Sequence, residues 1–312
     1  MKANLNKGIL ALAFVFVGSL AFANNEIERF DVWLNILQKS TEGAKNGEKA
    51  VEKLKDNPQS RIAAFNLQAL GKLYGAVSPD FDMLKKEFKK IEDGLGTIDK
   101  WNSIGNDKNK EKATKKFAQL LEKEHWIDEG KSSKINQIRN DLQSALKNLK
   151  NSDDKLIAQL DAQLEHIEST SFDFSILEAG NGLHEYRRQI RWFMIESQVL
   201  NGLITFNKEQ KSCPIEEYEE LLSLPIAESK YSTLASNPGL KKTCEITQCY
   251  FVAMSDAVEK LGKLKDKAEM AIGNTTSDQT PTELIAEAQK ISDQIHSTRL
   301  IKKLRSEIAN CL

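Results

Sequence analysis

The sequence lacks both a long apolar run beyond its N-terminal segment and an excess of positive charge. After that segment no stretch has eighteen uninterrupted apolar residues, which disfavours insertion into a membrane. The 312 residues include 44 Lys and Arg against 45 Asp and Glu, a formal net charge of −1. Proteins that bind nucleic-acid phosphates generally carry a basic domain, so we expect no nucleic-acid partner. Any cationic surface must therefore be local.

Motifs of catalysis and of metal binding are also missing. The chain has no glycine-rich phosphate loop, no Gly-x-Ser-x-Gly elbow and no His-Glu-x-x-His pair. His125, His166 and His296 each stand without a second ligand at metal spacing, and we interpret them as structural. Because no base, nucleophile, metal set or cofactor motif is recognisable, we expect a non-enzymatic protein without a cofactor. A phosphate-ester hydrolase is the enzymatic alternative.

The N-terminal segment has the layout of a cleavable secretory signal. Lys2 and Lys7 precede an apolar run at 9–17, and an Ala-Phe-Ala cleavage sequence ends at Ala23. The apolar run is too short to anchor the chain in a bilayer. We therefore predict a signal peptide at 1–23, cleaved near Ala23, and a periplasmic or secreted mature chain. Cleavage removes two lysines and no acid, so the mature net charge is −3.

All four cysteines lie in the last third of the chain. They are Cys213, Cys244, Cys249 and Cys311. Export would place them in an oxidising compartment, so two disulfides are expected, with three possible connectivities. We favour Cys213 with Cys244 and Cys249 with Cys311, because the second pair would tie the C-terminal helix to the rest. A zinc site is disfavoured, since no paired Cys-x-x-Cys occurs.

Helical periodicity extends over nearly every long segment, and strictly alternating β-branched runs are absent, so the expected fold is all-α. Five of the six prolines precede or open a helical pattern, where their fixed φ is tolerated. The predicted helices are 26–55, 58–76, 81–95, 110–126, 131–150, 154–168, 182–206, 214–224, 240–270, 281–295 and 297–310.

Four basic residues of the segment at 182–206 share one predicted helix face. They are His184, Arg187, Arg188 and Arg191, at i, i+3, i+4 and i+7. Glu185 and Glu196 lie off this stripe, so we expect no carboxylate of the same helix to neutralise it. Two interpretations remain open. The stripe is either a solvated face whose arginines pair with glutamates of neighbouring helices, or an anion site, because arginine forks bind phosphate bidentately.

The pattern His-x-x-Arg-x-x-x-Arg at His184, Arg187 and Arg191 resembles the signature of the CHAD family, the conserved-histidine α-helical domains whose basic helices bind inorganic polyphosphate. The family pattern also includes a Leu-Gly pair, followed by an apolar residue and an Asp, near the end of the next helix. This chain has two such sequences, at 94–100 and at 260–266. Their presence indicates an internal repeat.

The resemblance implies a single domain at 24–312, an elongated helical bundle of two repeated halves at approximately 24–170 and 181–312. The first-half counterpart of the basic helix is 61–74, in which only Arg61 and Lys72 are basic. A weaker candidate for anion binding is a lysine cluster just before the first Leu-Gly pair, although exposed lysines also serve solubility. The candidates in this cluster are Lys85, Lys86 and Lys89.

Together these features predict an exported, non-enzymatic helical bundle that binds polyphosphate or another phosphate-bearing anion through its basic helix face. The alternative is an envelope structural or protein-interaction module that has lost anion binding. The acidic net charge and the lack of a histidine in the first-half helix favour that alternative.

Overall fold

The structure is a computed structural model that describes residues 26–175, 182–207, 229–236, 240, 242–273 and 281–312. The predicted signal peptide at 1–23, the predicted helix at 214–224 and Cys213 lie outside the described residues.

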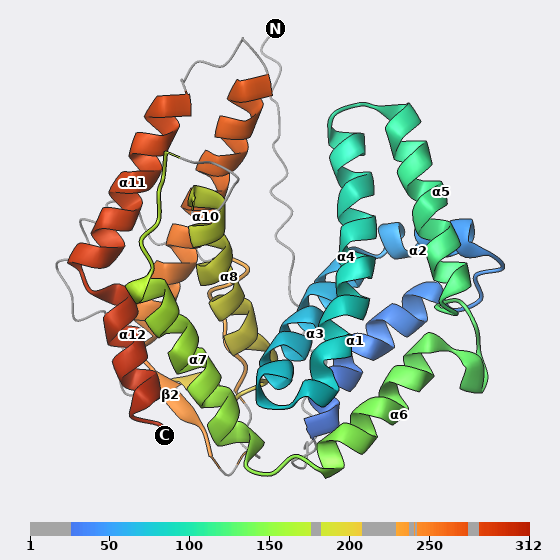
Figure 1. Ribbon diagram of the computed structural model, residues 1–312, viewed down its shortest axis with the longest axis horizontal. Coiled ribbons are helices and arrows are strands. Elements are labelled where there is room, and N and C mark those ends of the chain that lie inside the picture. Colours follow the sequence, from blue (N-terminus) through green and yellow to red (C-terminus); the bar gives the residue numbers. More distant parts are fainter. Residues whose placement is uncertain (1–25, 176–181, 208–228, 237–239, 241, 274–280) are drawn as a thin grey trace, which may run out of the picture.

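Helices dominate the described residues, which confirms the all-α fold (Figure 1). They are α1 (Glu26–Thr41), α2 (Gly47–Asp56), α3 (Pro58–Val77), α4 (Asp82–Ser103), α5 (Asp107–Lys123), α6 (Lys134–Lys147), α7 (Ser152–Ser169), α8 (Leu183–Val199), α10 (Gln248–Gly273), α11 (Pro281–Ser297) and α12 (Leu300–Ala309). Single 3-10 turns occur at Pro79–Phe81 and Gly130–Ser132. Two strands that the sequence did not predict, β1 (Ile204–Phe206) and β2 (Cys244–Ile246), pair in parallel.

Asparagine caps decide where the first helices begin. The sequence predicts one helix over 26–55, but the chain turns between α1 and α2, where Gly43 has a φ of +66° that suits glycine. The Asn46 side chain then accepts a hydrogen bond from the backbone N–H of Lys49, and Asn57 caps α3 in the same way. Each cap satisfies a backbone donor that the first turn of a helix leaves without a partner.

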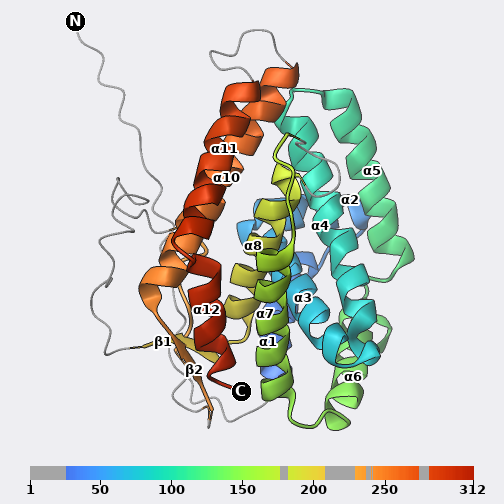
Figure 2. The ribbon, with the colours of Figure 1, turned by 60° about the vertical axis from the view of Figure 1, so that its left-hand side comes forward.

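The helices form two groups, α1 to α6 on one side and α7, α8, α10, α11 and α12 on the other (Figures 1 and 2). Helix α3 joins them, because it packs against α1 and α4 in its own group and against α7 and α8 in the other. Helix α7 packs most extensively against α12. The chain therefore passes from one group to the other between α6 and α7.

A glycine allows α3 and α4 to approach closely. A Cβ added at Gly71 would lie 2.6 Å from the backbone nitrogen of Lys85 and 2.9 Å from the Cβ of Leu84. Beside this contact Tyr74 and Phe81 are fully buried, with ring centroids 5.1 Å apart. The close approach brings the lysine-bearing face of α4 beside α3.

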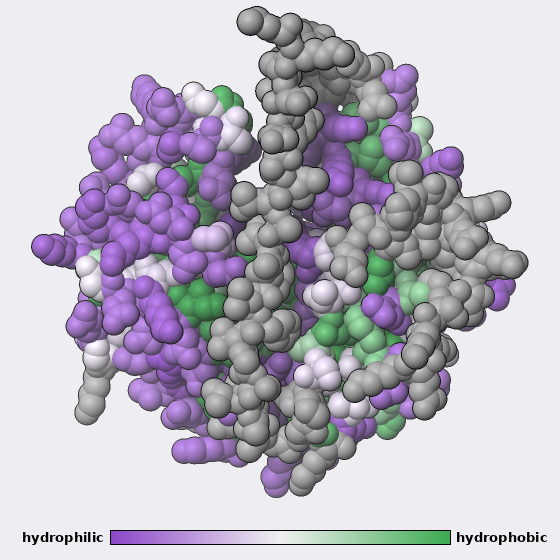
Figure 3. Space-filling model, turned by 180° about the vertical axis from the view of Figure 1, so that it is seen from behind, coloured by the Kyte–Doolittle hydropathy of each residue, from purple (hydrophilic) through white to green (hydrophobic). Residues whose placement is uncertain are grey.

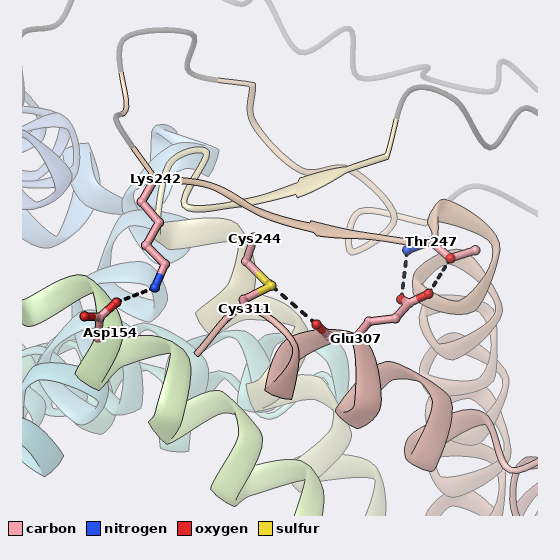
Figure 4. Close-up of a disulfide and its surroundings, with 6 residues drawn as sticks. All are labelled: Asp154, Lys242, Cys244, Thr247, Glu307 and Cys311. Atoms are coloured by element: carbon pink, nitrogen blue, oxygen red, sulfur yellow. Dashed lines mark hydrogen bonds and ion pairs between the residues drawn. A yellow bond between two sulfur atoms is a disulfide. The ribbon is translucent and has the colours of Figure 1, made fainter.

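A disulfide joins Cys244 of β2 to Cys311 at the end of the chain (Figure 4). Both expected pairs, Cys213 with Cys244 and Cys249 with Cys311, are therefore wrong. The reason is that β2 lies against α12, which places the two Cα atoms 5.4 Å apart, within the range that a disulfide requires. Cys249 is also disulfide-bonded. The expectation that a disulfide ties the C-terminal helix to the rest is confirmed.

Polar contacts also connect the segment around β2 to α7 and α12. The backbone N–H of Thr247 donates to the Glu307 carboxylate at 2.9 Å, and Lys242 pairs with Asp154 of α7 at 2.5 Å (Figure 4). Helices α7 and α12 and strand β2 are thus linked by a covalent bond and by charge.

None of the described helices has an apolar stretch long enough to cross a membrane. Seen from behind, hydrophilic residues cover much of the side that holds α4 and α5 (Figure 3). This agrees with the lysine-rich sequences of those two helices.

Candidate functional site

A groove of about 760 Å³ lies between α3 and α4 on one side and α7 and α8 on the other. Figure 2 shows α7 and α8 beside α3. The basic side chains that line the groove are Arg61, Lys72, Lys85, Lys89, Arg188 and Arg191. Among the described lining residues the acids are Glu92 and Glu185. The groove is therefore a local cationic surface on a chain of nearly zero net charge.

The residues of the predicted stripe do not share one surface. Arg188 and Arg191 line the groove, whereas His184 and Arg187 do not. Arg187 instead lies against α10, where its Nε donates to the carbonyl oxygen of Val258 at 3.4 Å. The described α8 residues in the groove are Glu185, Arg188, Gln189, Arg191 and Trp192. The face of α8 that lines the groove is therefore shifted by one residue along the sequence from the face of the predicted basic stripe.

Glu185 pairs with Arg188. Its Oε2 lies 2.9 Å from Arg188 Nε, and its Oε1 lies 3.1 Å from Nη2. The expectation that no carboxylate of the same helix neutralises the stripe is therefore wrong for Arg188, because residues three apart on a helix are neighbours. Since the Arg188 side chain is 50% exposed, the pair contributes little to stability and can open toward a ligand.

Arg191 has no carboxylate partner among the described residues. Its guanidinium carbon lies 5.5 Å from the ring centroid of Phe65 on α3 and 5.9 Å from that of Trp192. Its Nε is buried without a hydrogen-bond acceptor, and burial lowers the pKa of this side chain. Trp192, which its apolar neighbours on the helix suggest is a core residue, is half-buried and lines the groove. A guanidinium in this setting is stabilised by any anion that reaches it.

Glu196 is fully buried and links α8 to α3 and α7. Its Oε1 accepts a hydrogen bond from Lys72 Nζ of α3 at 2.7 Å, and its Oε2 accepts one from the Gln163 amide of α7. Burial raises the pKa of Glu196, and the charge of Lys72 opposes that shift. Because Lys72 is held by this carboxylate, it adds less positive charge to the groove than its formal charge suggests.

The three lysine candidates of α4 have different positions. Lys85 lines the groove and has no ion pair among the described residues. Lys89 also lines it but pairs with Asp93 at 2.7 Å. Lys86 is exposed and is not among the residues that line the groove.

The two Leu-Gly sequences occupy equivalent places in the structure. A Cβ added at Gly96 of α4 would lie 2.8 Å from Nη2 of Arg61 on α3. A Cβ added at Gly262 of α10 would lie 2.7 Å from Nε of Arg187 on α8. In each half, therefore, an arginine of one helix packs on the glycine of the next. This packing agrees with the internal repeat inferred from the sequence.

Helix α7 contributes groove residues that the sequence did not single out. They are Gln159, Ala162, Gln163, His166 and Ile167, most of them at the i, i+3, i+4 and i+7 spacing of one face. Three acids of this helix, Asp161, Glu165 and Glu168, point elsewhere, because all three pair with Arg305 of α12. The spacing of these residues can be read from the sequence. That this face of α7 lines a cationic groove depends on α3, α4 and α8, and the sequence of α7 does not indicate it.

Within the described part of the chain, no cluster of three or more His, Cys, Asp or Glu side chains is arranged to hold a metal ion. His125 and His296, which are interpreted as structural from the sequence, have partners nearby in the chain or in the fold. His125 contacts Asp128 at 2.8 Å in an exposed turn, and the ring of His296 stacks with that of Tyr186 at 6.4 Å.

Comparisons with known proteins identify no relative. No protein-family model matches the chain, and neither a curated protein nor a solved structure is similar to it. The groove is therefore the feature from which a function can be inferred.

Proposed function

We propose that this chain is a non-enzymatic, exported helical-bundle protein that binds polyphosphate or another phosphate-bearing anion in the groove between α3–α4 and α7–α8. The observation that carries the proposal is Arg191, a charged side chain that lines a cationic groove, lies against two aromatic rings and lacks a carboxylate partner among the described residues. Arg188 and Lys85 add charge to the same surface.

The binding mechanism is static and multivalent. Arginine donors form bidentate hydrogen bonds with phosphate oxygens, and lysines add Coulomb attraction that does not depend on orientation. Because most of the groove cations are partly exposed, salt screens their attraction, with a Debye length of about 8 Å at physiological ionic strength. Affinity is therefore expected to fall steeply as salt is raised.

Two further observations support the proposal. The resemblance of the α8 sequence to the CHAD signature implies the same ligand class, and the packing of Arg61 on Gly96 and of Arg187 on Gly262 supports the duplicated architecture that the family implies. The Cys244–Cys311 disulfide supports export, because disulfides persist mainly in oxidising compartments.

The alternative, an envelope module that has lost anion binding, is favoured by the ion pairs inside the groove. Four of its basic residues have carboxylate partners, so much of the positive charge is already neutralised. These residues are Arg61, Lys72, Lys89 and Arg188. This alternative predicts that the chain shows no measurable affinity for phosphate chains even at low salt.

The test is a calorimetric titration of the mature chain with polyphosphate at low and at moderate salt, repeated for Arg191→Ala and for Lys86→Ala. Because a hydrogen bond to a charged group contributes about 1.5–3 kcal/mol, we expect Arg191→Ala to weaken binding about 10-fold to 100-fold. Lys86→Ala removes an exposed charge outside the groove and should change affinity less than about twofold. Equal effects of the two variants, or no binding at low salt, would contradict the proposal.

A further inference from the structure

The α7 wall of the groove contains one titratable side chain, His166. Its described neighbours on that wall are amides and apolar groups, since the nearby acids Asp161, Glu165 and Glu168 pair with Arg305 of α12. His166 is exposed, whereas His184, the histidine of the basic helix, is not among the residues that line the groove. The imidazole that can reach a bound anion is therefore on α7 and not on α8.

The contacts of His166 show which hydrogen-bond partners the unliganded groove offers to its ring. Its Nε2 lies 3.4 Å from the amide nitrogen of Gln189 on α8, and its Nδ1 lies 3.4 Å from Oγ1 of Thr170. The same Gln189 nitrogen donates to Oε1 of Glu185 at 3.1 Å, which identifies it as the amide N–H group. Neutral imidazole can accept a hydrogen bond from Gln189 at Nε2. Protonated imidazole has only donors, so Nε2–H then faces another donor and requires a new acceptor.

The charged groups that line the groove with His166 or share its helix have partners or are cations, so an external anion is the best source of that acceptor. From α8 they are Glu185, which is already paired with Arg188, and Arg191. From α3 they are Arg61 and Lys72, and from α4 they are Lys85, Lys89 and Glu92, all lining the same groove. Glu92 is paired with Arg61. On α7 itself Glu165 and Glu168 pair with Arg305.

We propose that His166 is the histidine that contacts the bound anion, and that its protonation tightens anion binding. The neutral ring adds no charge to the groove, whereas the protonated ring adds one positive charge and two N–H donors. The proposal rests on the anion site described above, because it assigns a further ligand contact within that site.

The experiment compares wild-type, His166→Gln and His184→Gln full-length chains in titrations with inorganic polyphosphate at pH 7.5 and pH 5.5, at constant ionic strength. Glutamine keeps a polar side chain of similar length but cannot gain a proton. We expect the wild-type chain to bind about fivefold more tightly at pH 5.5, as one added ion pair at an accessible site would give. His166→Gln should bind like the wild type at pH 7.5 and lose most of the gain at pH 5.5. His184→Gln should keep the gain.

The outcomes separate this inference from the proposed function. If none of the chains binds polyphosphate at low salt, the anion site itself is wrong. If all bind and His166→Gln keeps the full pH dependence, the site stands and the role of His166 is overturned. If His184→Gln loses the gain and His166→Gln keeps it, the histidine of the basic helix is the contact. Because the same ligand is used throughout, protonation of the phosphate chain affects all three proteins equally and cancels in the comparison.

Discussion

In both halves of the molecule an arginine packs on a glycine of the next helix. The halves differ in the residue that lies one helical turn after that arginine. Arg61 packs on Gly96 in the first half, and Arg187 packs on Gly262 in the second. Four residues after each arginine, the first half has Phe65 and the second has Arg191. These two side chains meet at the junction between the halves, with the guanidinium carbon 5.5 Å from the ring centroid.

This difference shows how two similar helix pairs can form a junction that neither pair has alone. If both positions were aromatic, the junction would be an apolar contact; if both were basic, two guanidinium groups would repel each other. With one of each, the ring supports the cation from one side and leaves its Nη atoms available to a ligand. The arginines that pack on glycine play a structural role in both halves, since Arg61 pairs with Glu92 and Arg187 binds a carbonyl of α10.

The halves also differ in cysteine content, and the largest expected effect follows from this. The Cys244–Cys311 disulfide closes a loop with a sequence separation of 67 residues. Because such a cross-link restricts the unfolded chain, Cys311→Ser is expected to lower the free energy of unfolding by about 4 kcal/mol. Urea titration measures the loss, and hydrogen exchange should locate it first in α12 and β2. Earlier loss of protection in α3 and α4 would show that the halves do not differ in this way.

The next largest effect concerns the ion pair that joins the halves. Lys72→Ala leaves the carboxylate of Glu196 fully buried without its cation, so we expect a loss of about 3 kcal/mol. Glu196→Gln leaves Lys72, whose side chain is 34% exposed, free to be hydrated, and should cost less than about 1 kcal/mol. Unfolding of both variants in urea at pH 7 measures this asymmetry. Similar losses would mean that the buried carboxylate is not the costly partner.

The same pair predicts a dependence on pH. Burial raises the pKa of Glu196 in the folded protein above its value in the unfolded chain, so the folded state binds this proton more tightly. The contribution of Glu196 to stability is therefore largest at low pH and falls as the pH rises through the folded pKa. Relative to Glu196→Gln, the wild-type protein should gain stability as the pH falls from 7 toward 4.5. A constant difference would contradict the raised pKa.

The smallest effect tests the helix contacts within each half. At the position equivalent to Gly71 the second half has Ser197, which is buried. Gly71→Ser would place a Cβ 2.6 Å from a backbone nitrogen of α4, so we expect a loss of about 2 kcal/mol. Gly262→Ala meets only the flexible end of Arg187 and should cost less than about 1 kcal/mol. Thermal unfolding of the two variants compares the cost of a clash with a rigid backbone with that of a clash with a flexible side chain.

Several features of the fold could be predicted because they depend on nearby residues. Helical periodicity predicted most of the described helices, and the Leu-Gly pairs predicted a repeat whose arginine contacts the structure contains. The split of the segment at 26–55 was missed, although Asn46 is a strong N-cap residue, because periodicity continues across the turn.

The candidate site could be predicted only in part. Arg188 and Arg191 were singled out and line the groove, but Phe65, Gln163 and His166 were not connected with them. His166 is a lone histidine on a helix whose other polar residues are mostly acids and amides, so no local pattern distinguishes it from a structural residue. His166 lines the groove only because α7 packs beside α8 in the fold.

The sequence by itself determined that the chain is helical, that it contains two similar Leu-Gly segments, and that α8 is rich in arginine, because each of these depends on residues within a few turns of one helix. Only the tertiary structure decided which arginine of the groove remains without a carboxylate partner among the described residues, which histidine faces the groove and which cysteine pairs with Cys244. The physical reason is that the rotation of α8, the close approach of α3 and α4 and the contact of β2 with α12 come from packing between segments far apart in the chain.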